Sequence, residues 1–324
     1  MNPNKSLKAF IVYSADLLFL PFTFLVALIS KFHARFGAER LPLSYKVWDS
    51  FGVAPVRYHY YQPLVKADEL PTEIWEQKDP LFGIDFNLKV QLSLLEKFNY
   101  QSELAQFPLK KNNEKYLFYH HNGFFEHCDA EIFYSVLRYF KPAKLIEIGA
   151  GFSTLLAKSA LEINNTEGKR CEHICIEPYE NQWLQDIGVD KVIREKVENL
   201  PLKTFELLEA GDILFIDSSH VIRTGGDVCY EYLKILPSLK PGVIIHIHDI
   251  FLPSEYPREW LVNRRLYWNE QYLLQAFLAF NSEFEVLLAL NYLGQNHSQE
   301  LSEKCPIYAK IGGIPGSFWI RRKI

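Results

Sequence analysis

The sequence has few cysteines and no C-x-x-C pair, with five cysteines spread over 324 residues. An odd count without paired spacing supports neither a disulfide framework nor a zinc knuckle, and it is typical of reduced thiols in a cytosolic protein. A basic block is also lacking: the net charge is −4 with both signs mixed along the chain. The charge pattern therefore gives no indication of a nucleic-acid partner.

Internal repeats and low-complexity tracts are absent, which excludes repeat architectures. What is present is an ordinary globular composition, 48% hydrophobic and 23% charged. The length suits one large domain with additions or two modest domains. Aromatic residues are plentiful, with 24 Phe, 18 Tyr and 6 Trp, which favours a packed interior and an aromatic-lined pocket.

One long hydrophobic run stands at the N-terminus, from Ala9 to Ser30. It is long enough to cross a bilayer as a helix, although Asp16 and Pro21 weaken that interpretation. No A-x-A cleavage site follows it, so a removed signal peptide is not expected. We predict membrane association at the cytoplasmic face, either spanning or interfacial; a soluble cytoplasmic protein with this helix packed on its domain, or an oligomer contact, is the alternative. Basic residues flank the run on both sides: Lys5, Lys8, Lys31, Arg35 and Arg40.

The chain divides by composition into three parts. Residues 1–40 form the hydrophobic N-terminal segment. Residues 41–115 are interrupted by prolines and read as a cap or arm, with one amphipathic helix marked by Leu88, Leu92 and Leu95. Residues 116–324 are expected to form the catalytic domain.

Strand-like and helix-like segments alternate through residues 116–324, which predicts an α/β fold with a mostly parallel sheet and helices on both faces. The last two strands lack a predicted helix between them, which suggests an antiparallel C-terminal hairpin with residues 291–316 as its loop. The expected strands are 144–148, 173–177, 191–197, 212–217, 242–249, 283–290 and 317–322. The expected helices are 129–140, capped by Asp129, and 153–163, 179–187, 202–208, 225–236 and 270–280.

A glycine turn, Gly149-Ala150-Gly151, follows the first of these strands. Ligands of open parallel sheets bind beyond the carboxyl ends of the strands, where the strand order reverses. A dinucleotide-binding fingerprint would place a third glycine or alanine three residues after Gly151, but Thr154 stands there. The turn alone is therefore weak support for a nicotinamide cofactor.

Two carboxylates at the strand ends favour a different cofactor. Glu147 stands two residues before Gly149, where it would repel a pyrophosphate. S-adenosylmethionine carries an ammonium and a sulfonium and has no phosphate, so a carboxylate suits it. Glu177, at the end of the second strand, is placed to accept both ribose hydroxyls.

The ordered motifs LIEIGAGFST, CIEP, ILFIDSSH and IIHIHDIF resemble those of the class I S-adenosylmethionine-dependent methyltransferases. The resemblance covers about Tyr116 to Arg322. It is closest to a bacterial branch of small-molecule O-methyltransferase-like proteins that are often linked to surface polysaccharides. The N-terminal hydrophobic segment, followed by RLPL and HYYQPL, is similar to that branch as well.

This resemblance implies a Rossmann-like fold with a seven-stranded sheet and an antiparallel C-terminal hairpin. It implies an S-adenosylmethionine-dependent enzyme that methylates a hydroxyl of a saccharide or glycolipid precursor in polysaccharide biosynthesis. The cofactor contacts that it implies are Glu147, Gly149, Gly151, Ser153 and Glu177, with Asn122 and Asp129 closing over the cofactor.

Catalytic candidates follow the fourth and fifth strands. His220 stands three residues after Asp217, where related metal-dependent O-methyltransferases place a catalytic lysine, and we predict that it is the general base. Asp217 and Asp249 could hold Mg²⁺. The related enzymes have Asn after the second Asp, but Ile250 stands there, so a third metal ligand is missing. Without a metal, Asp249 would orient His220 or the substrate.

Three other readings stay open. His246 and His248 lie on one face of the fifth strand, as a zinc-dependent hydrolase would need. The chain could instead bind S-adenosylmethionine as a scaffold or regulator without transferring a methyl group. An NAD-binding oxidoreductase is the third reading, and Glu147 and Thr154 argue against it.

Recognition of the acceptor is expected from the fifth strand end and the aromatic, charged segment after Asp249. Its side chains could stack on a sugar or grip an anionic group such as a phosphate, or simply pack on the sheet. The candidate substrate residues are His248, Trp260, Arg264, Arg265, Trp268 and Glu270.

Overall fold

The computed structural model describes residues 3–179 and 181–324. The chain forms two compact units, Met1–Pro71 and Thr72–Ile324. All seven strands belong to the second unit. Residues 72–115, which the sequence assigns to an N-terminal arm, thus belong to the same unit as the sheet.

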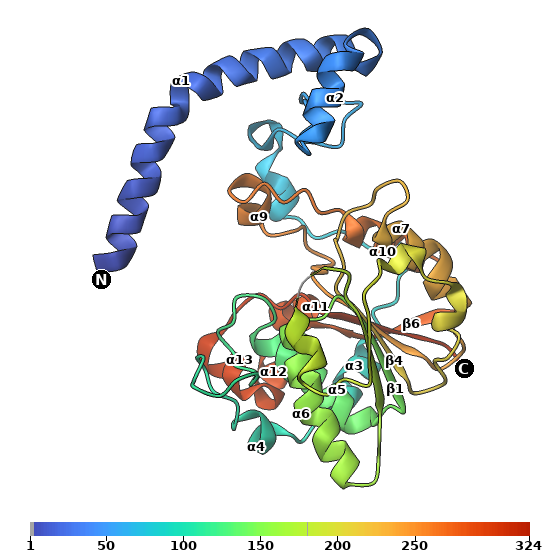
Figure 1. Cartoon of the computed structure of the whole chain (residues 1–324). Coiled ribbons are helices and arrows are strands. Elements are labelled where there is room, and N and C mark those ends of the chain that lie inside the picture. The colour runs from blue at the N-terminus through green and yellow to red at the C-terminus, as the bar shows by residue number, and fades with distance from the viewer. Residues whose placement is uncertain (1–2, 180) are drawn as a thin grey trace. The chain divides into compact units, whose positions relative to one another are not determined.

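The first unit consists mainly of the long helix α1 (Pro3–Arg40) and the short helix α2 (Pro42–Ser50). Helix α1 contains Pro21, and its helical geometry is broken at Gly37, which has φ 76°. Figure 1 shows this helix as a bent rod. Within its stretch Lys8–Arg40, an 18-residue window has a mean hydropathy of 2.0 and none of that window is buried, so by length and composition the helix could cross a membrane.

The second unit is built on one seven-stranded sheet with the order β3-β2-β1-β4-β5-β7-β6 (Figure 1). Strands β1 to β5 pair in parallel, and β7 pairs antiparallel with both β5 and β6. The predicted fold class and the antiparallel C-terminal hairpin are confirmed. The strands are β1 (Lys144–Ile148), β2 (Glu172–Ile176), β3 (Lys191–Ile193), β4 (Ile213–Ile216), β5 (Ile244–Ile247), β6 (Phe284–Ala289) and β7 (Phe318–Arg322).

Helices cover both faces of the sheet because its central strands are buried on both sides and are therefore apolar throughout. One face packs against α3 (Leu88–Lys97), α5 (His127–Phe140) and α6 (Phe152–Thr166). The other packs against the helical segment Asp227–Ser238 and α10 (Glu270–Leu278). Shorter helices are α4 (Gln101–Leu104) and α9 (Arg258–Val262), and the one-turn helices are Ala67–Glu69, Thr72–Trp75, Gln182–Gln185, Val197–Asn199 and Leu202–Thr204.

The link between β6 and β7 differs from the expected helix-free loop. It contains α11 (Leu290–Asn296), α12 (Ser298–Lys304) and α13 (Pro306–Ile311). Leu293 and Leu301 are fully buried on the α5 side of the sheet. The prediction was wrong because these helices are short and have few apolar residues. Such helices are stable only when those residues are packed against the sheet and α5.

Helix α5 begins two residues earlier than the sequence predicts, so Asp129 lies in its first turn and does not cap it. The carboxylate of Asp129 instead accepts backbone N–H groups of Gly316 and Ser317, at 2.8 to 3.1 Å. These bonds tie the start of α5 to the loop before β7. The amphipathic helix predicted around Leu88, Leu92 and Leu95 is confirmed as α3.

Candidate functional site

The glycine turn lies where the strand order reverses, between β1 and its neighbour β4. Gly149 has φ 79°, and a Cβ atom built on it would lie 1.9 Å from the backbone oxygen of Asp217. Only glycine therefore lets the end of β1 pass so close to the end of β4. A Cβ atom at Gly151 meets no atom within 4 Å.

All three backbone N–H groups of the glycine turn already have partners inside the protein. Gly149 donates to the carbonyl oxygen of Ile176 at 3.0 Å. Ala150 donates to a carboxylate oxygen of Glu177 at 3.3 Å, and Gly151 donates to the hydroxyl of Thr154 at 3.0 Å. Thr154, the residue that departs from the dinucleotide-binding fingerprint, thus accepts a hydrogen bond from the turn. No N–H group of the turn remains to bind a phosphate.

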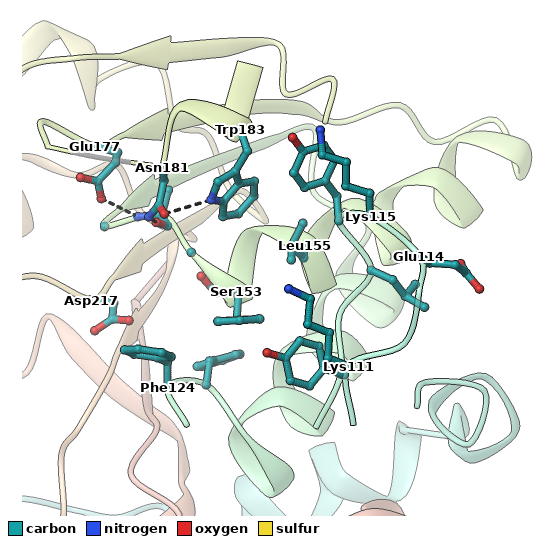
Figure 2. Close-up of a pocket in the computed structure, with 18 residues that line it drawn as sticks. Lys111, Glu114, Lys115, Phe124, Ser153, Leu155, Glu177, Asn181, Trp183 and Asp217 are labelled. Atoms are coloured by element: carbon teal, nitrogen blue, oxygen red, sulfur yellow. Dashed lines mark hydrogen bonds between the residues drawn. The ribbon is translucent and has the colours of Figure 1, made fainter. Parts of the chain in front are cut away.

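A cavity of about 600 Å³ opens over this turn (Figure 2). Its size is within the range of about 300–1,000 Å³ that is usual for small-molecule sites. Figure 2 shows Glu177 and Asp217 on one side of the cavity and Lys111, Glu114 and Lys115 on the opposite side. The lining also includes Tyr116, Tyr119, Phe124, Phe125, Gly149, Ala150, Gly151, Phe152, Ser153, Asn181 and Trp183.

Glu177 projects from the end of β2 into this cavity, as the sequence predicts for a ribose-binding acid. Its second carboxylate oxygen accepts the N–H of Tyr179 at 2.9 Å, so two backbone donors orient it. Asn181 binds the carbonyl of Ala150 and accepts the indole N–H of Trp183 at 3.0 Å, which positions the indole beside the cavity (Figure 2). Ser153 lines the cavity at the start of α6.

Glu147 does not line the cavity, contrary to the prediction that it contacts the cofactor. Its side chain is fully buried behind the turn, where a carboxylate oxygen lies 2.5 Å from Nε2 of His173. Cys175 lies on the same face, 3.6 Å from that oxygen. Strand alternation explains the difference, because a residue two positions before the turn points into the α5 and α6 layer.

Asn122 and Asp129 are likewise structural and do not line the large cavity. The side-chain oxygen of Asn122 accepts the N–H groups of Phe124 and Phe125, at 2.9 and 2.8 Å. This turn places both phenyl rings in the cavity wall. The segment predicted to close over the cofactor lines the cavity through Phe124 and Phe125, while Asp129 holds the loop before β7.

His220 lies at the centre of a buried charge cluster. Nδ1 is 2.8 Å from a carboxylate oxygen of Glu270, and Nε2 is 3.2 Å from Asp217 and 3.8 Å from Asp249. Burial disfavours the charged imidazole, but the hydrogen bonds to Asp217 and Glu270 outweigh it and raise the pKa of His220 well above its ordinary value. With both nitrogens facing carboxylates, His220 has no free lone pair, so its prediction as general base does not fit this geometry.

The same arrangement bears on the predicted Mg²⁺ site. The imidazole of His220 stands between the carboxylates of Asp217 and Asp249. A cation bridging the two carboxylates would have to displace it, and Ile250 offers no third ligand. The residues therefore do not fit a Mg²⁺ ion, because the protonated imidazole of His220 already provides the positive charge between the two carboxylates.

We expect His220→Ala to lower the free energy of unfolding by about 3–5 kcal/mol, since it leaves Glu270 buried without its cation. Glu270 is fully buried, and its remaining side-chain partner is the hydroxyl of Tyr232. Urea unfolding monitored by circular dichroism measures the loss. The double variant His220→Ala/Glu270→Gln should recover part of it, and a single-variant loss below about 1 kcal/mol would contradict the buried pair.

His248 and Asp249 follow β5 and line a second, smaller pocket. Neither nitrogen of His248 has a hydrogen bond among the described residues, and its Nε2 lies 3.6 Å from Asp249. Burial lowers the pKa of His248, but the charges of Asp249, Asp217 and Asp129 more than compensate and raise it. His220 and Asp249 both have positive φ, 59° and 54°, a strained backbone that is common at functional sites.

His246 has no access to a metal or a substrate, which removes the basis of the zinc-hydrolase reading. Its ring is fully buried, stacked on Phe215 at 4.0 Å, and its Nε2 lies 2.9 Å from the hydroxyl of Ser317. Burial lowers the pKa of His246 well below its ordinary value. It is a neutral core residue, although it shares a strand face with His248.

The predicted substrate residues separate into three groups. Trp260 and His248 line the smaller pocket. Glu270 belongs to the core beneath His220, and Trp268 packs on His220 at 4.4 Å. The guanidinium of Arg264 lies over the Trp260 ring at 5.5 Å, and among the described pockets neither Arg264 nor Arg265 lines one.

Sequence reasoning missed several residues that line the large cavity, chiefly Trp183, Asn181, Phe124 and Tyr119. Tyr119 and Phe124 lie in the connecting segment before α5, and Asn181 and Trp183 lie where the sequence predicts a helix over 179–187 and the structure has the one-turn helix Gln182–Gln185. No motif marks any of the four. The one available signal is position, because Asn181 and Trp183 follow Glu177 directly beyond the end of β2.

Comparison with known proteins supports a methyltransferase. A family model described as a methyltransferase domain matches residues 146–250, which span β1 to the end of β5. An uncharacterized protein from Archaeoglobus fulgidus is 30% identical over 165 residues, covering 47% of this chain and 72% of the relative.

Solved structures show more distant likeness. The O-methyltransferase TomG from Streptomyces achromogenes, in complex with S-adenosylmethionine, has 15% identity and a TM-score of 0.36, covering 71% of this chain and 90% of its own. The O-methyltransferase from Bacillus cereus, in complex with S-adenosylhomocysteine, has 15% identity and a TM-score of 0.36, covering 71% and 91%. These likenesses are too distant to assign an activity.

Proposed function

We propose that the chain, whose residues 146–250 match a methyltransferase-domain model, is an S-adenosylmethionine-dependent methyltransferase that methylates a hydroxyl group of a small acceptor, a saccharide or glycolipid precursor. Glu177 would hold the ribose hydroxyls, Trp183 would stack on the adenine, and Ser153 at the start of α6 would bind the carboxylate of the methionine end. All three residues line the large cavity.

One observation carries the choice of cofactor: every N–H group of the glycine turn is bonded within the protein. A dinucleotide needs such donors for its pyrophosphate. S-adenosylmethionine has no phosphate to place there. The closed turn thus favours the methyl donor over NAD.

S-adenosylmethionine supplies an electrophilic methyl group, so that the acceptor oxygen forms the new O–C bond as the C–S bond breaks and S-adenosylhomocysteine leaves. The protein aligns the two reactants and accepts the hydroxyl proton. We assign the proton to Nε2 of His248, because Nδ1 is sealed from solvent and His220 is bound on both sides by carboxylates. His220 then positions Asp217 and Asp249.

We expect Glu177→Ala to weaken S-adenosylmethionine binding about 10- to 100-fold, since hydrogen bonds to a charged group contribute about 1.5–3 kcal/mol. Calorimetric titration of the purified protein measures the change. Glu172→Ala is the matched control, because Glu172 lies on the same strand, is half-exposed and pairs with Lys144. Equal affinities in the two variants would contradict the assigned ribose site.

The same titration tests the cofactor itself. Wild-type protein should bind S-adenosylmethionine and S-adenosylhomocysteine and should not bind NAD. Binding of NAD alone would overturn the proposed function.

We further propose that α1 attaches the protein to the cytoplasmic face of a membrane. Most of its large apolar side chains between residues 10 and 32 are exposed. The basic residues Lys31, Arg35 and Arg40 stand at the C-terminal end of this apolar stretch. A lipid-linked saccharide would be presented at that surface. A soluble protein using α1 for self-association is the alternative.

We expect the full chain to float with vesicles of phosphatidylethanolamine and phosphatidylglycerol, and the variant Leu20→Lys/Leu25→Lys to remain in the soluble fraction. Each lysine at the centre of a membrane helix costs about 2.5–3.5 kcal/mol. Leu43→Lys is the control, because Leu43 is an exposed leucine on α2. Flotation of the double variant together with the wild type would contradict attachment through α1.

A further inference from the structure

A second, smaller pocket lies beside the large cavity. Its volume is about 280 Å³, and it shares Phe124 with the larger cavity, so the two are neighbours across one phenyl ring. It lies between the end of β5, the start of α5 and the loop before β7. Its lining is Gly123, Phe124, Glu126, His127, Cys128, Asp129, His248, Asp249, Phe251, Trp260, Tyr308, Gly313, Ile314 and Pro315.

Polar side chains of His127, His248 and Asp249 line this pocket. Nδ1 of His248 and Nε2 of His127 are buried and lack a hydrogen bond. The carboxylate of Asp249 is only 16% exposed, and its nearest described cationic groups are His248 at 3.6 Å and His220 at 3.8 Å, both beyond hydrogen-bond distance. The partly exposed carboxylate of Asp249 is therefore available to accept hydrogen bonds from the hydroxyl groups of a ligand.

Carboxylates outnumber the ionisable cations of the lining, which are the histidines His127 and His248, and this disfavours an anionic ligand. Three carboxylates, those of Glu126, Asp129 and Asp249, line the pocket, and no lysine or arginine does. Arg264 is held over the ring of Trp260 instead. A phosphate or carboxylate on the reacting ring would be repelled by Asp249 at short range.

The apolar part of the lining includes the aromatic rings of Trp260 and Phe251. Trp260 and Phe251 meet edge to face with centroids 5.3 Å apart, and both line the pocket. Aromatic faces beside carboxylates suit a ring that has C–H groups on its faces and hydroxyls around its edge. The volume is near the lower limit of small-molecule sites, about 300 Å³, which suits a single ring.

From this geometry we infer that the smaller pocket holds the acceptor as one uncharged, polyhydroxylated ring, stacked on Trp260 and hydrogen-bonded by Asp249 and His127. The inference rests on the proposed function and narrows it, because the unit that receives the methyl group carries no phosphate, sulfate or carboxylate. Phosphates of a larger glycolipid or sugar nucleotide would remain outside the pocket.

The test uses the full chain in two steps. S-adenosylhomocysteine is first titrated by calorimetry, and the saturated protein is then examined by saturation-transfer NMR with methyl glycosides of glucose, galactose, mannose, rhamnose, fucose and xylose. Matched anionic probes are methyl glucuronide, methyl galacturonide and the 6-phosphates of the hexoses. We expect at least one neutral glycoside to bind and its anionic counterparts to bind at least tenfold more weakly.

Two variants separate the pockets. Trp260→Ala should abolish glycoside binding and leave S-adenosylhomocysteine affinity within twofold, whereas Trp183→Ala should do the reverse. Asp249→Asn should reduce the discrimination against the uronides. A protein that folds and binds S-adenosylhomocysteine but binds no neutral glycoside, or binds the anionic partner equally well, would overturn the inference alone. Failure to bind S-adenosylhomocysteine would remove the proposed function itself.

Discussion

Gly149→Ala will destabilise the protein by about 3 kcal/mol and abolish cofactor binding, because the added methyl group meets the backbone rather than a movable side chain. The Cβ atom would lie 1.9 Å from the carbonyl oxygen of Asp217, at a residue with φ 79°. Overpacking typically costs about 1–3 kcal/mol, and a left-handed conformation costs a non-glycine residue about 1–2 kcal/mol more. Thermal unfolding and calorimetric titration with S-adenosylmethionine measure the two effects.

Gly151→Ala is the matched control, with the same added methyl group two residues along. Its Cβ meets no atom within 4 Å, and its φ of −166° is not in the left-handed region. We expect its unfolding temperature to remain close to that of the wild type. Equal destabilisation by the two substitutions would contradict the close approach of β1 and β4.

His248→Gln will lower kcat about 100- to 10,000-fold, the usual contribution of a general base, while S-adenosylmethionine affinity stays unchanged. Glutamine keeps a polar side chain in the pocket but cannot accept the hydroxyl proton. The rate is measured as S-adenosylhomocysteine formed with a saturating acceptor. His121→Gln is the control, since His121 is an exposed histidine near the same pocket wall.

The pH dependence of kcat/KM gives a second test of His248. The base works only when neutral, so the rate should rise with pH through the pKa of His248. Burial lowers this pKa, but Asp249, Asp217 and Asp129 raise it overall, which moves the rising limb above the ordinary histidine value of about 6.5. Asp249→Asn should shift that limb to lower pH. A wild-type limb that stays in place when Asp249 is neutralised would remove His248 as the base.

The fold could be predicted from the sequence because its signals are local. Apolar runs such as Ile213–Ile216 and Ile244–Ile247 are strands that are buried on both faces, and short buried runs bounded by turns keep that pattern whatever surrounds them. The helices between β6 and β7 could not be predicted, since their stability comes from burying Leu293 and Leu301 against α5 and its neighbours.

The site divides in the same way. The sequence by itself determined the glycine turn, the acid at Glu177 and the positions of Asp217 and Asp249, because the end of each parallel strand lies at one edge of the sheet. Only the tertiary structure decided the direction of each side chain and its partners. In the folded protein Glu147 is buried against His173, and His220 lies between the carboxylates of Asp217 and Glu270. Nδ1 of His248 is buried without a hydrogen bond. These outcomes depend on contacts between residues distant in the chain, such as His220 and Glu270, and no local pattern encodes them.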